Sequence, residues 1–143
     1  MSVRQILEEK GREVVTLRPE ATLEEAIQIL AGRKIGAIVL VDAQGAVAGI
    51  VSERDIVRLI GTSGVASISQ SVRDVMTLAV TTCTESTSIN EAMELMTHGR
   101  FRHLPVCEED KLVGIISIGD VVKRRIEEVE REANEMREYI AAG

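Results

Sequence analysis

Two short segments of the chain repeat one order of residue types. GIVSERD at 49–55 and GIISIGD at 114–120 are each an apolar run that ends in a serine, with an aspartate three residues after the serine. A serine there caps a following helix, and an aspartate at the third helical position favours the helix dipole and the free backbone amides. The same carboxylate has a second possible use, to accept hydrogen bonds from the hydroxyl groups of a ligand. Either use needs a strand that leads directly into a helix.

The two segments belong to an internal repeat of about sixty residues. The matching pairs are VRQIL 3–7 with VRDVM 72–76, VVTLRPEATL 14–23 with TTCTESTSI 81–89, LEEAIQIL 23–30 with INEAMELM 89–96, and IGAIVLVD 35–42 with FRHLPVCE 101–108. The alignment slips by one residue in the turn after each middle strand. The chain therefore contains two copies of one structural unit.

Each copy has a readable order of elements. Thr22 with Glu25, and Ser88 with Glu91, have capping-box spacing before apolar residues at helical periods. Short β-branched runs at 37–41 and 104–107 are separated by polar turns from the runs at 47–51 and 112–117, which predicts hairpins. A second helix follows each final strand. Each half is thus predicted to be β-α-β-β-α, and neither half is large enough to be stable alone.

Composition excludes several classes of protein. The formal charge is −6 and aromatic residues make up 1% of the chain, so neither a broad positive field nor a base-stacking platform is expected and nucleic-acid binding is not predicted. The longest unbroken aliphatic run, 37–41, is too short to span a bilayer. Cys83 and Cys107 show no metal-ligand spacing, which favours reduced thiols in a cytoplasmic protein and no metal site.

The repeat resembles a tandem pair of cystathionine-β-synthase-type (CBS) domains, also called a Bateman module. The resemblance rests on the two G-h-h-S-x-x-D segments (h, apolar), on RHLPV at 102–106 and on the order of elements. It implies an α+β fold in which two repeats pack sheet to sheet with pseudo-two-fold symmetry. The expected boundaries are repeat 1 at 1–62, a linker at 63–70, repeat 2 at 71–128 and a C-terminal helical extension at 129–143.

The resemblance also implies a function. Such modules commonly bind adenosine-containing ligands between their two repeats, and many act as regulatory units. AMP is the leading expected ligand, with NAD(H) or ATP as alternatives, and the chain is expected to be a sensor rather than an enzyme. CBS pairs often form disc-like homodimers, which predicts a homodimer here.

Carried over to this sequence, the family pattern predicts a ligand site around Asp120. Asp120 and Ser117 would hold the ribose, while Arg102 and His103 would give charge-assisted hydrogen bonds to phosphate. The adenine base would lie against residues of the first repeat, with one residue of the second repeat beneath it; these are Thr16, Ile35, Gly36, Ala37 and Ile115.

A related site is predicted around Asp55. Its ribose side would be Ile50, Ser52 and Asp55, with Arg54 as an added cation, and Thr82, Phe101, Arg102 and His103 would lie opposite. Gly36 and Ala37 stand in the first repeat where the second repeat has Arg102 and His103. The two sites are therefore not equivalent, and unequal occupancy is an open alternative.

Two other functions remain open. The repeats could form a ligand-free dimeric interaction module in which Ser52, Asp55, Ser117 and Asp120 are only helix caps. A small hydrolase would depend on His103, but the chain offers no plausible positioned nucleophile.

The C-terminal segment has a pattern of its own. Apolar residues alternate in steps of four and three along an otherwise charged helix, at Val122, Ile126, Val129, Ala133, Met136 and Ile140. Either this stripe lies back on its own domain or it forms a contact between subunits. The subunit contact is preferred, because the stripe would otherwise expose apolar surface.

Overall fold

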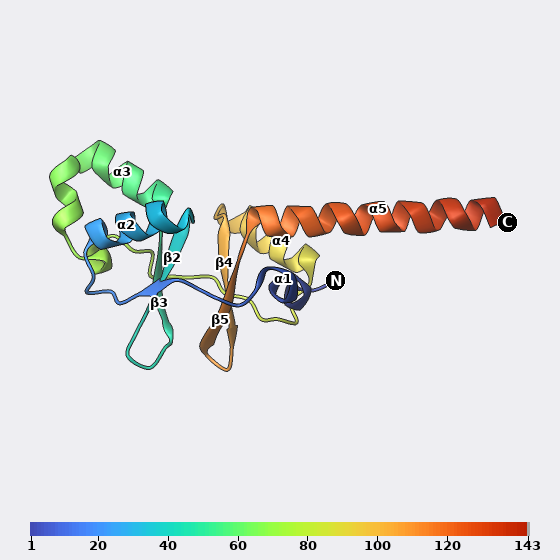
Figure 1. The fold of residues 1–143 in the computed structure, drawn as a ribbon, viewed down its shortest axis with the longest axis horizontal. Helices are drawn as coiled ribbons and strands as arrows, with labels where there is room; N and C mark the ends of the chain where they lie inside the picture. Colours follow the sequence, from blue (N-terminus) through green and yellow to red (C-terminus); the bar gives the residue numbers. More distant parts are fainter. Residues whose placement is uncertain (143) are drawn as a thin grey trace. The chain divides into compact units, whose positions relative to one another are not determined.

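The computed structural model describes residues 1–142, and within them helices and strands alternate as the repeat predicts (Figure 1). The first half contains α1 (Val3–Lys10), β1 (Thr16–Leu17), α2 (Leu23–Arg33), β2 (Ala37–Val41), β3 (Val47–Ser52) and α3 (Glu53–Ser63). Two short 3₁₀ helices follow, η1 (Val65–Ser69) and η2 (Val72–Asp74). The second half contains α4 (Ile89–Gly99), β4 (His103–Glu108), β5 (Lys111–Ser117) and α5 (Ile118–Ala142). The mixed α+β fold with two sheets and a long C-terminal helix is confirmed.

The chain divides into two compact units whose boundaries differ from those of the sequence repeat. Unit 1 contains residues 1–12, 82–106 and the chain from 114 through α5, whereas unit 2 contains 13–81 and 107–113. The helix α1 therefore belongs with the second repeat, and η2 belongs with the first. The apolar side chains of each segment explain this placement: Val3, Ile6 and Leu7 are buried in unit 1, and Val72 is buried in the core of unit 2.

Unit 2 is built on a three-stranded sheet of order β1-β2-β3. β1 is parallel to β2, with Thr16 opposite Val39, and β2 is antiparallel to β3, with Ala37 opposite Ser52. Thr22 caps α2 through a 3.2 Å hydrogen bond from the backbone N–H of Glu25 to its Oγ1, as its spacing predicted. The core of unit 2 is aliphatic and is formed by side chains of the sheet and of the helices that pack on it: Leu23, Ala26, Leu30, Ile38, Leu40, Val51, Ile56 and Val72.

Unit 1 follows the same plan with a shorter first strand. β4 and β5 form a two-stranded sheet, and the segment before α4 joins it only through a parallel bridge between Cys83 and Val106 in the described residues. The bridge corresponds to the pairing of Leu17 with Leu40 in unit 2. The first strand of each repeat is thus short: within the matching segments 14–23 and 81–89, two residues pair with the sheet in unit 2 and one residue in unit 1.

The segment predicted as a linker, 63–70, has regular structure. α3 ends at Ser63, Gly64 adopts a positive φ of 85°, and Val65–Ser69 forms η1. Ile68 packs against the core of unit 2. The glycine and serines of this segment make a turn and a short helix.

The glycine that opens each G-h-h-S segment has a packing role. A Cβ added at Gly114 would lie 2.7 Å from Cδ2 of Leu7, and one added at Gly49 would lie 2.6 Å from Sδ of Met76. Leu7 and Met76 are the fifth residues of the matching VRQIL and VRDVM segments. In each unit the glycine therefore leaves room for this apolar side chain to pack closely against the strand.

The helix α5 begins on unit 1 and continues well past α1 and α4 (Figure 1). Val121 is buried and Arg124 makes ion pairs with Glu9 of α1 and with Glu127. Among the described residues, no helix combines the length and apolar character needed to cross a membrane.

Candidate functional site

Asp120 lies in the first turn of α5, directly after β5. Its Oδ2 accepts a 2.8 Å hydrogen bond from the backbone N–H of Ser117, and Oγ of Ser117 accepts a 3.2 Å hydrogen bond from the backbone N–H of Asp120. These reciprocal bonds satisfy free amides at the start of the helix. The predicted capping role of Ser117 and Asp120 is confirmed.

Lys10 of α1 adds a contact that the sequence analysis missed. Its Nζ donates to Oδ2 of Asp120 at 2.8 Å and to the backbone carbonyl of Ile115 at 3.1 Å. Partial burial acts to raise the pKa of Asp120, but the hydrogen bonds from Lys10 and Ser117 and the charge of Lys10 together hold that pKa below its ordinary value. Lys10 therefore keeps this carboxylate ionised and fixed in orientation.

Asp55 makes the corresponding cap in unit 2. The backbone N–H of Ser52 donates to Oδ2 of Asp55 at 2.9 Å, and the backbone N–H of Asp55 donates to Oγ of Ser52 at 3.3 Å. The position that matches Lys10 in the repeat is Ala79. The carboxylate of Asp55 thus has its cap but no lysine from the matching segment.

Both caps leave part of the carboxylate open. Every hydrogen bond to Asp55 and Asp120 within residues 1–142 reaches Oδ2, so Oδ1 of each accepts none there. Both aspartates are half-buried, so Oδ1 is a fixed acceptor at a helix N-terminus. A capping role and a role in binding hydroxyl groups are therefore compatible.

The residue before each middle strand is bound to the start of the last helix of its unit. The backbone N–H of Ile118 donates to the carbonyl of Arg102 at 2.8 Å, and the backbone N–H of Glu53 donates to the carbonyl of Gly36 at 3.0 Å. In unit 1 this bond sets Arg102 beside the cap formed by Ser117 and Asp120. The Arg102 side chain is exposed and has no ion-pair partner among the described residues.

The remaining predicted residues divide between the units. Besides Arg102, Ser117 and Asp120, unit 1 holds Thr82, Phe101, His103 and Ile115, and unit 2 holds Thr16, Ile35, Gly36, Ala37, Ile50, Ser52, Arg54 and Asp55. Within unit 1, His103 starts β4 next to Arg102, and the Phe101 ring lies against Gly99. Within unit 2, Ala37 of β2 pairs with Ser52 of β3, and Arg54 is exposed. The grouping of residues from both units around each aspartate stays a prediction.

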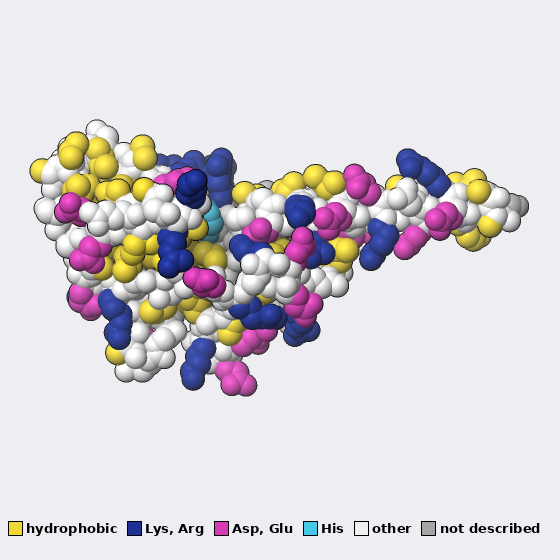
Figure 2. Space-filling model, viewed as in Figure 1, with side chains coloured by type: hydrophobic (Ala, Val, Ile, Leu, Met, Phe, Trp, Pro, Cys, Tyr) yellow, Lys and Arg dark blue, Asp and Glu magenta, His cyan; other side chains and the backbone are white. Residues whose placement is uncertain are grey.

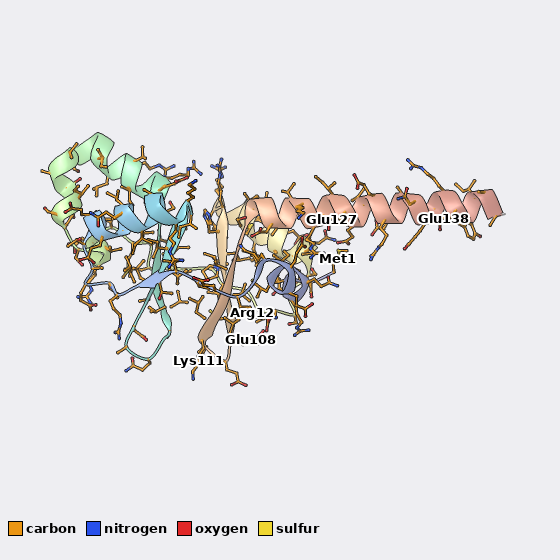
Figure 3. The ribbon with its side chains drawn as sticks, in the orientation of Figure 1. Met1, Arg12, Glu108, Lys111, Glu127 and Glu138 are labelled. Atoms are coloured by element: carbon orange, nitrogen blue, oxygen red, sulfur yellow. The ribbon has the colours of Figure 1, made fainter. Side chains whose placement is uncertain are left out.

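Other polar side chains supply little chemistry. No group of three histidine, cysteine or acidic side chains able to hold a metal ion occurs among residues 1–142. Burial, together with the charges of Asp110 and Glu108, raises the pKa of the Cys107 thiol, which disfavours the reactive thiolate. Arg12, labelled in Figure 3, follows α1 and forms a 2.6 Å ion pair with Glu85. That pair ties the end of α1 to unit 1.

Two repeated α+β units, each with a strand that ends in a serine-aspartate cap, define a tandem-domain protein. The family model described as "CBS domain" matches residues 3–62 and 72–127. The chain belongs to the CBS-domain family and contains two of its domains.

Individual relatives agree with this assignment. The chain is 38% identical over 126 residues to the mitochondrial CBS domain-containing protein CBSX3 of Arabidopsis thaliana, which covers 85% of this chain and 61% of that protein. It therefore spans less than two thirds of that relative's length. The crystal structure of the CBS-domain protein ATU1752 from Agrobacterium tumefaciens matches with a TM-score of 0.84 and 49% identity, covering 87% of this chain and 99% of that one. CBSX2 in complex with AMP matches at 25% identity with a TM-score of 0.71, covering 88% and 96%.

Proposed function

We propose that the chain is a regulatory module that binds an adenine nucleotide, with AMP as the favoured ligand and NAD(H) or ATP as alternatives. The observation that carries this proposal is the cap at Asp120, in which a fixed, ionised carboxylate keeps Oδ1 available beside an exposed arginine. A nucleotide needs an acceptor for its ribose hydroxyls and donors for its phosphate. In unit 1, Asp120 supplies the acceptor and Arg102 supplies the donors.

The backbone supports the same assignment. The bond from Ile118 to the Arg102 carbonyl fixes the start of the basic pair Arg102-His103 at the N-terminus of α5. Arginine and protonated histidine side chains give charge-assisted hydrogen bonds to phosphate oxygens, so phosphate is the expected group beside this pair. Ribose at Asp120 with phosphate toward Arg102 and His103 is the arrangement we propose.

The base contacts are proposed from the family pattern. Thr16, Ile35, Gly36, Ala37 and Ile115 would line the adenine of the nucleotide held by Asp120. Ile50, Ser52, Arg54 and Asp55, with Thr82, Phe101, Arg102 and His103, would serve a second nucleotide. The AMP complex of CBSX2 supports AMP as the ligand class for a CBS pair.

A ligand-free interaction module is the competing function. It is favoured by one observation, that both aspartates already make complete capping boxes. In that case Ser52, Asp55, Ser117 and Asp120 would stabilise two helices, and the module would act only through its surfaces.

Calorimetric titration of the chain with AMP, ATP, NAD⁺ and NADH separates these functions. Native mass spectrometry of the freshly purified protein provides a second view, because a retained nucleotide identifies itself by mass. We expect saturable binding of at least one adenine nucleotide. Absence of binding by all four at millimolar concentration would favour the interaction module.

The regulatory role itself is also a proposal. No catalytic step is assigned to the chain; the bound nucleotide would change its conformation or assembly and thereby affect an unidentified protein target. A cytoplasmic location with reduced thiols remains our expectation. Thermal melts with and without AMP measure the first requirement of this role, a free-energy difference between the bound and free protein.

A further inference from the structure

The helix α5 presents an apolar seam, defined here as Val122, Ile126, Val129, Ala133, Met136 and Ile140. The five larger side chains of this seam are between 40 and 68% exposed. Their spacing of four and three residues is that of the a and d positions of a coiled coil. Ile126, Ala133 and Ile140 take position a, and Val122, Val129 and Met136 take position d.

The seam does not coincide with the face that α5 turns toward unit 1. The covered side chains of α5 are Val121, Arg124 and Glu128, at one end of the helix. At 3.6 residues per turn, the centre of the seam lies roughly 125° around the helix from that face. Figure 2 shows hydrophobic side chains at the surface of α5 out to its far end. A partner helix can therefore reach the seam while α5 keeps its contacts with α1 and α4.

The charges beside the seam indicate which partner fits. The charged residues at position g are Arg125 and Glu132, and the e positions one heptad further along are Glu130 and Arg137. In a parallel coiled coil the g residue of one helix lies beside the e residue of the following heptad on the other helix. Two parallel copies of α5 would thus pair Arg125 with Glu130 and Glu132 with Arg137, each of them twice.

The opposite orientation is electrostatically worse. An antiparallel pair at full overlap places e opposite e and g opposite g. Glu130 would then face the same residue of the second copy, and so would Glu132. Like charges at such positions oppose association.

We propose that α5 pairs with α5 of a second copy of this chain as a parallel two-stranded coiled coil over residues 122–140. The occupant of the seam is the same seam of the other copy. The parallel direction follows from the charges at Arg125, Glu130, Glu132 and Arg137. The pairing does not require a nucleotide.

Sedimentation equilibrium of the full chain with charge-reversed variants tests the proposal. The wild type should be a dimer. Glu132→Arg places arginine beside Arg137 of the second copy, and dimerisation should weaken at least about tenfold at low salt. Glu132→Arg combined with Arg137→Glu restores the opposite charges and should recover the dimer. Glu138→Arg, on the face away from the seam and labelled in Figure 3, is the matched control and should change the dimer less than about twofold.

Mixing two single variants gives a sharper test of direction. Glu132→Arg and Arg137→Glu chains should each dimerise poorly alone but combine into a heterodimer, because both of its g-to-e pairs are then attractive. Circular dichroism of each variant checks that α5 remains helical. A monomeric wild type, or a dimer unaffected by Glu132→Arg in a folded protein, would overturn the proposal.

Disulfide crosslinking fixes the orientation directly. With Cys107→Ser as background, Ile140→Cys should crosslink to itself in a parallel pair, since both residues occupy the same layer. In an antiparallel pair Ile140→Cys would lie beside position 122 and would crosslink with Val122→Cys chains. Peptide mapping of the oxidised products distinguishes a crosslink between two copies of position 140 from one between positions 140 and 122. A crosslink between positions 140 and 122 contradicts the parallel pairing.

Discussion

The two serine-aspartate caps have the same local geometry but different tertiary support. In unit 2, Asp55 is bound only to Ser52 among residues 1–142. In unit 1, Asp120 is bound to Ser117 and also to Lys10, at 2.8 Å. The difference arises from the segment that packs across the last strand of each unit, β5 in unit 1 and β3 in unit 2. In unit 1 it is a helix, α1, that reaches Lys10, whereas in unit 2 η2 ends at Asp74 and Thr77 forms backbone hydrogen bonds with Ile50.

This comparison shows how two copies of one structural unit can differ in their tertiary contacts. A capping box depends on four consecutive residues, so duplication copies it intact. The contact of Lys10 with Asp120 depends on the helix α1 continuing as far as Lys10. Because the matching segment of unit 2 is helical only to Asp74, the contact is found in unit 1 and not in unit 2 among the described residues. The basic residue Arg102 adds to the asymmetry, because Gly36 takes its place in unit 2. We therefore expect the Asp120 cap to dominate nucleotide binding.

The largest expected effect on stability concerns Leu7 and Met76, the two side chains that pack against the glycines of the last strands. Leu7 is fully buried against Gly114, while Met76, its counterpart against Gly49, is half-buried. Leu7→Ala should lower the free energy of unfolding by about 2–5 kcal/mol, and Met76→Ala by clearly less. Urea denaturation of both variants measures this difference. An equal loss of unfolding free energy in Leu7→Ala and Met76→Ala would mean that the two side chains stabilise their units equally, which contradicts this prediction.

A smaller effect is expected for the carboxylates themselves. If Asp120 holds the ribose, Asp120→Ala removes charge-assisted hydrogen bonds of about 1.5–3 kcal/mol each, and affinity for AMP should fall at least about tenfold. Loss of the cap should also lower stability by roughly 1 kcal/mol. Asp55→Ala should also lose a helix cap, but the affinity for AMP at the stronger site should change much less.

Asp120→Asn is the control for this pair, because asparagine retains a cap but offers one carbonyl acceptor. Titration of AMP and NADH into all three variants, with thermal melts alongside, separates capping from binding. Unchanged affinity in a folded Asp120→Ala protein contradicts the ribose assignment. A greater loss of affinity in Asp55→Ala would reverse the ranking of the two units.

The smallest effect is expected at Lys10. The Lys10–Asp120 pair is partly exposed, so Lys10→Met should lower the free energy of unfolding by about 0–1 kcal/mol at pH 7. The pKa of Asp120 is lower in the folded protein than its ordinary value of about 3.9. The stabilisation is therefore fully present above about pH 4 and is lost as the pH falls through the lowered pKa.

Urea denaturation at pH 7 and at about pH 3 tests this sign, with Lys111→Met, at the exposed start of β5, as the control. The difference between wild type and Lys10→Met should shrink in acid, whereas the control should show little difference at either pH. A difference that grows in acid would show that Lys10 does not act through the ionised Asp120.

Short-range features of this protein were predictable from sequence. The starts of α2 and α4 follow from Thr22 and Ser88 and their spacing to glutamates, and both capping boxes follow from Ser-x-x-Asp after an apolar run. The hairpins follow from β-branched runs that flank polar turns. These features depend on neighbouring residues, so their physical causes lie within a few positions of the chain.

The tertiary structure alone decided which distant segments meet. The segments VRQIL and VRDVM have apolar residues at the same three positions, yet the first packs in the unit of the second repeat and the second in the unit of the first. The contact between Lys10 and Asp120 spans 110 positions, and no local pattern marks it. Similarly, the spacing on α5 marks an apolar stripe, but only packing shows that unit 1 covers a different face. Local preferences fix what each segment forms, whereas the choice among equivalent partners depends on the path of the whole chain.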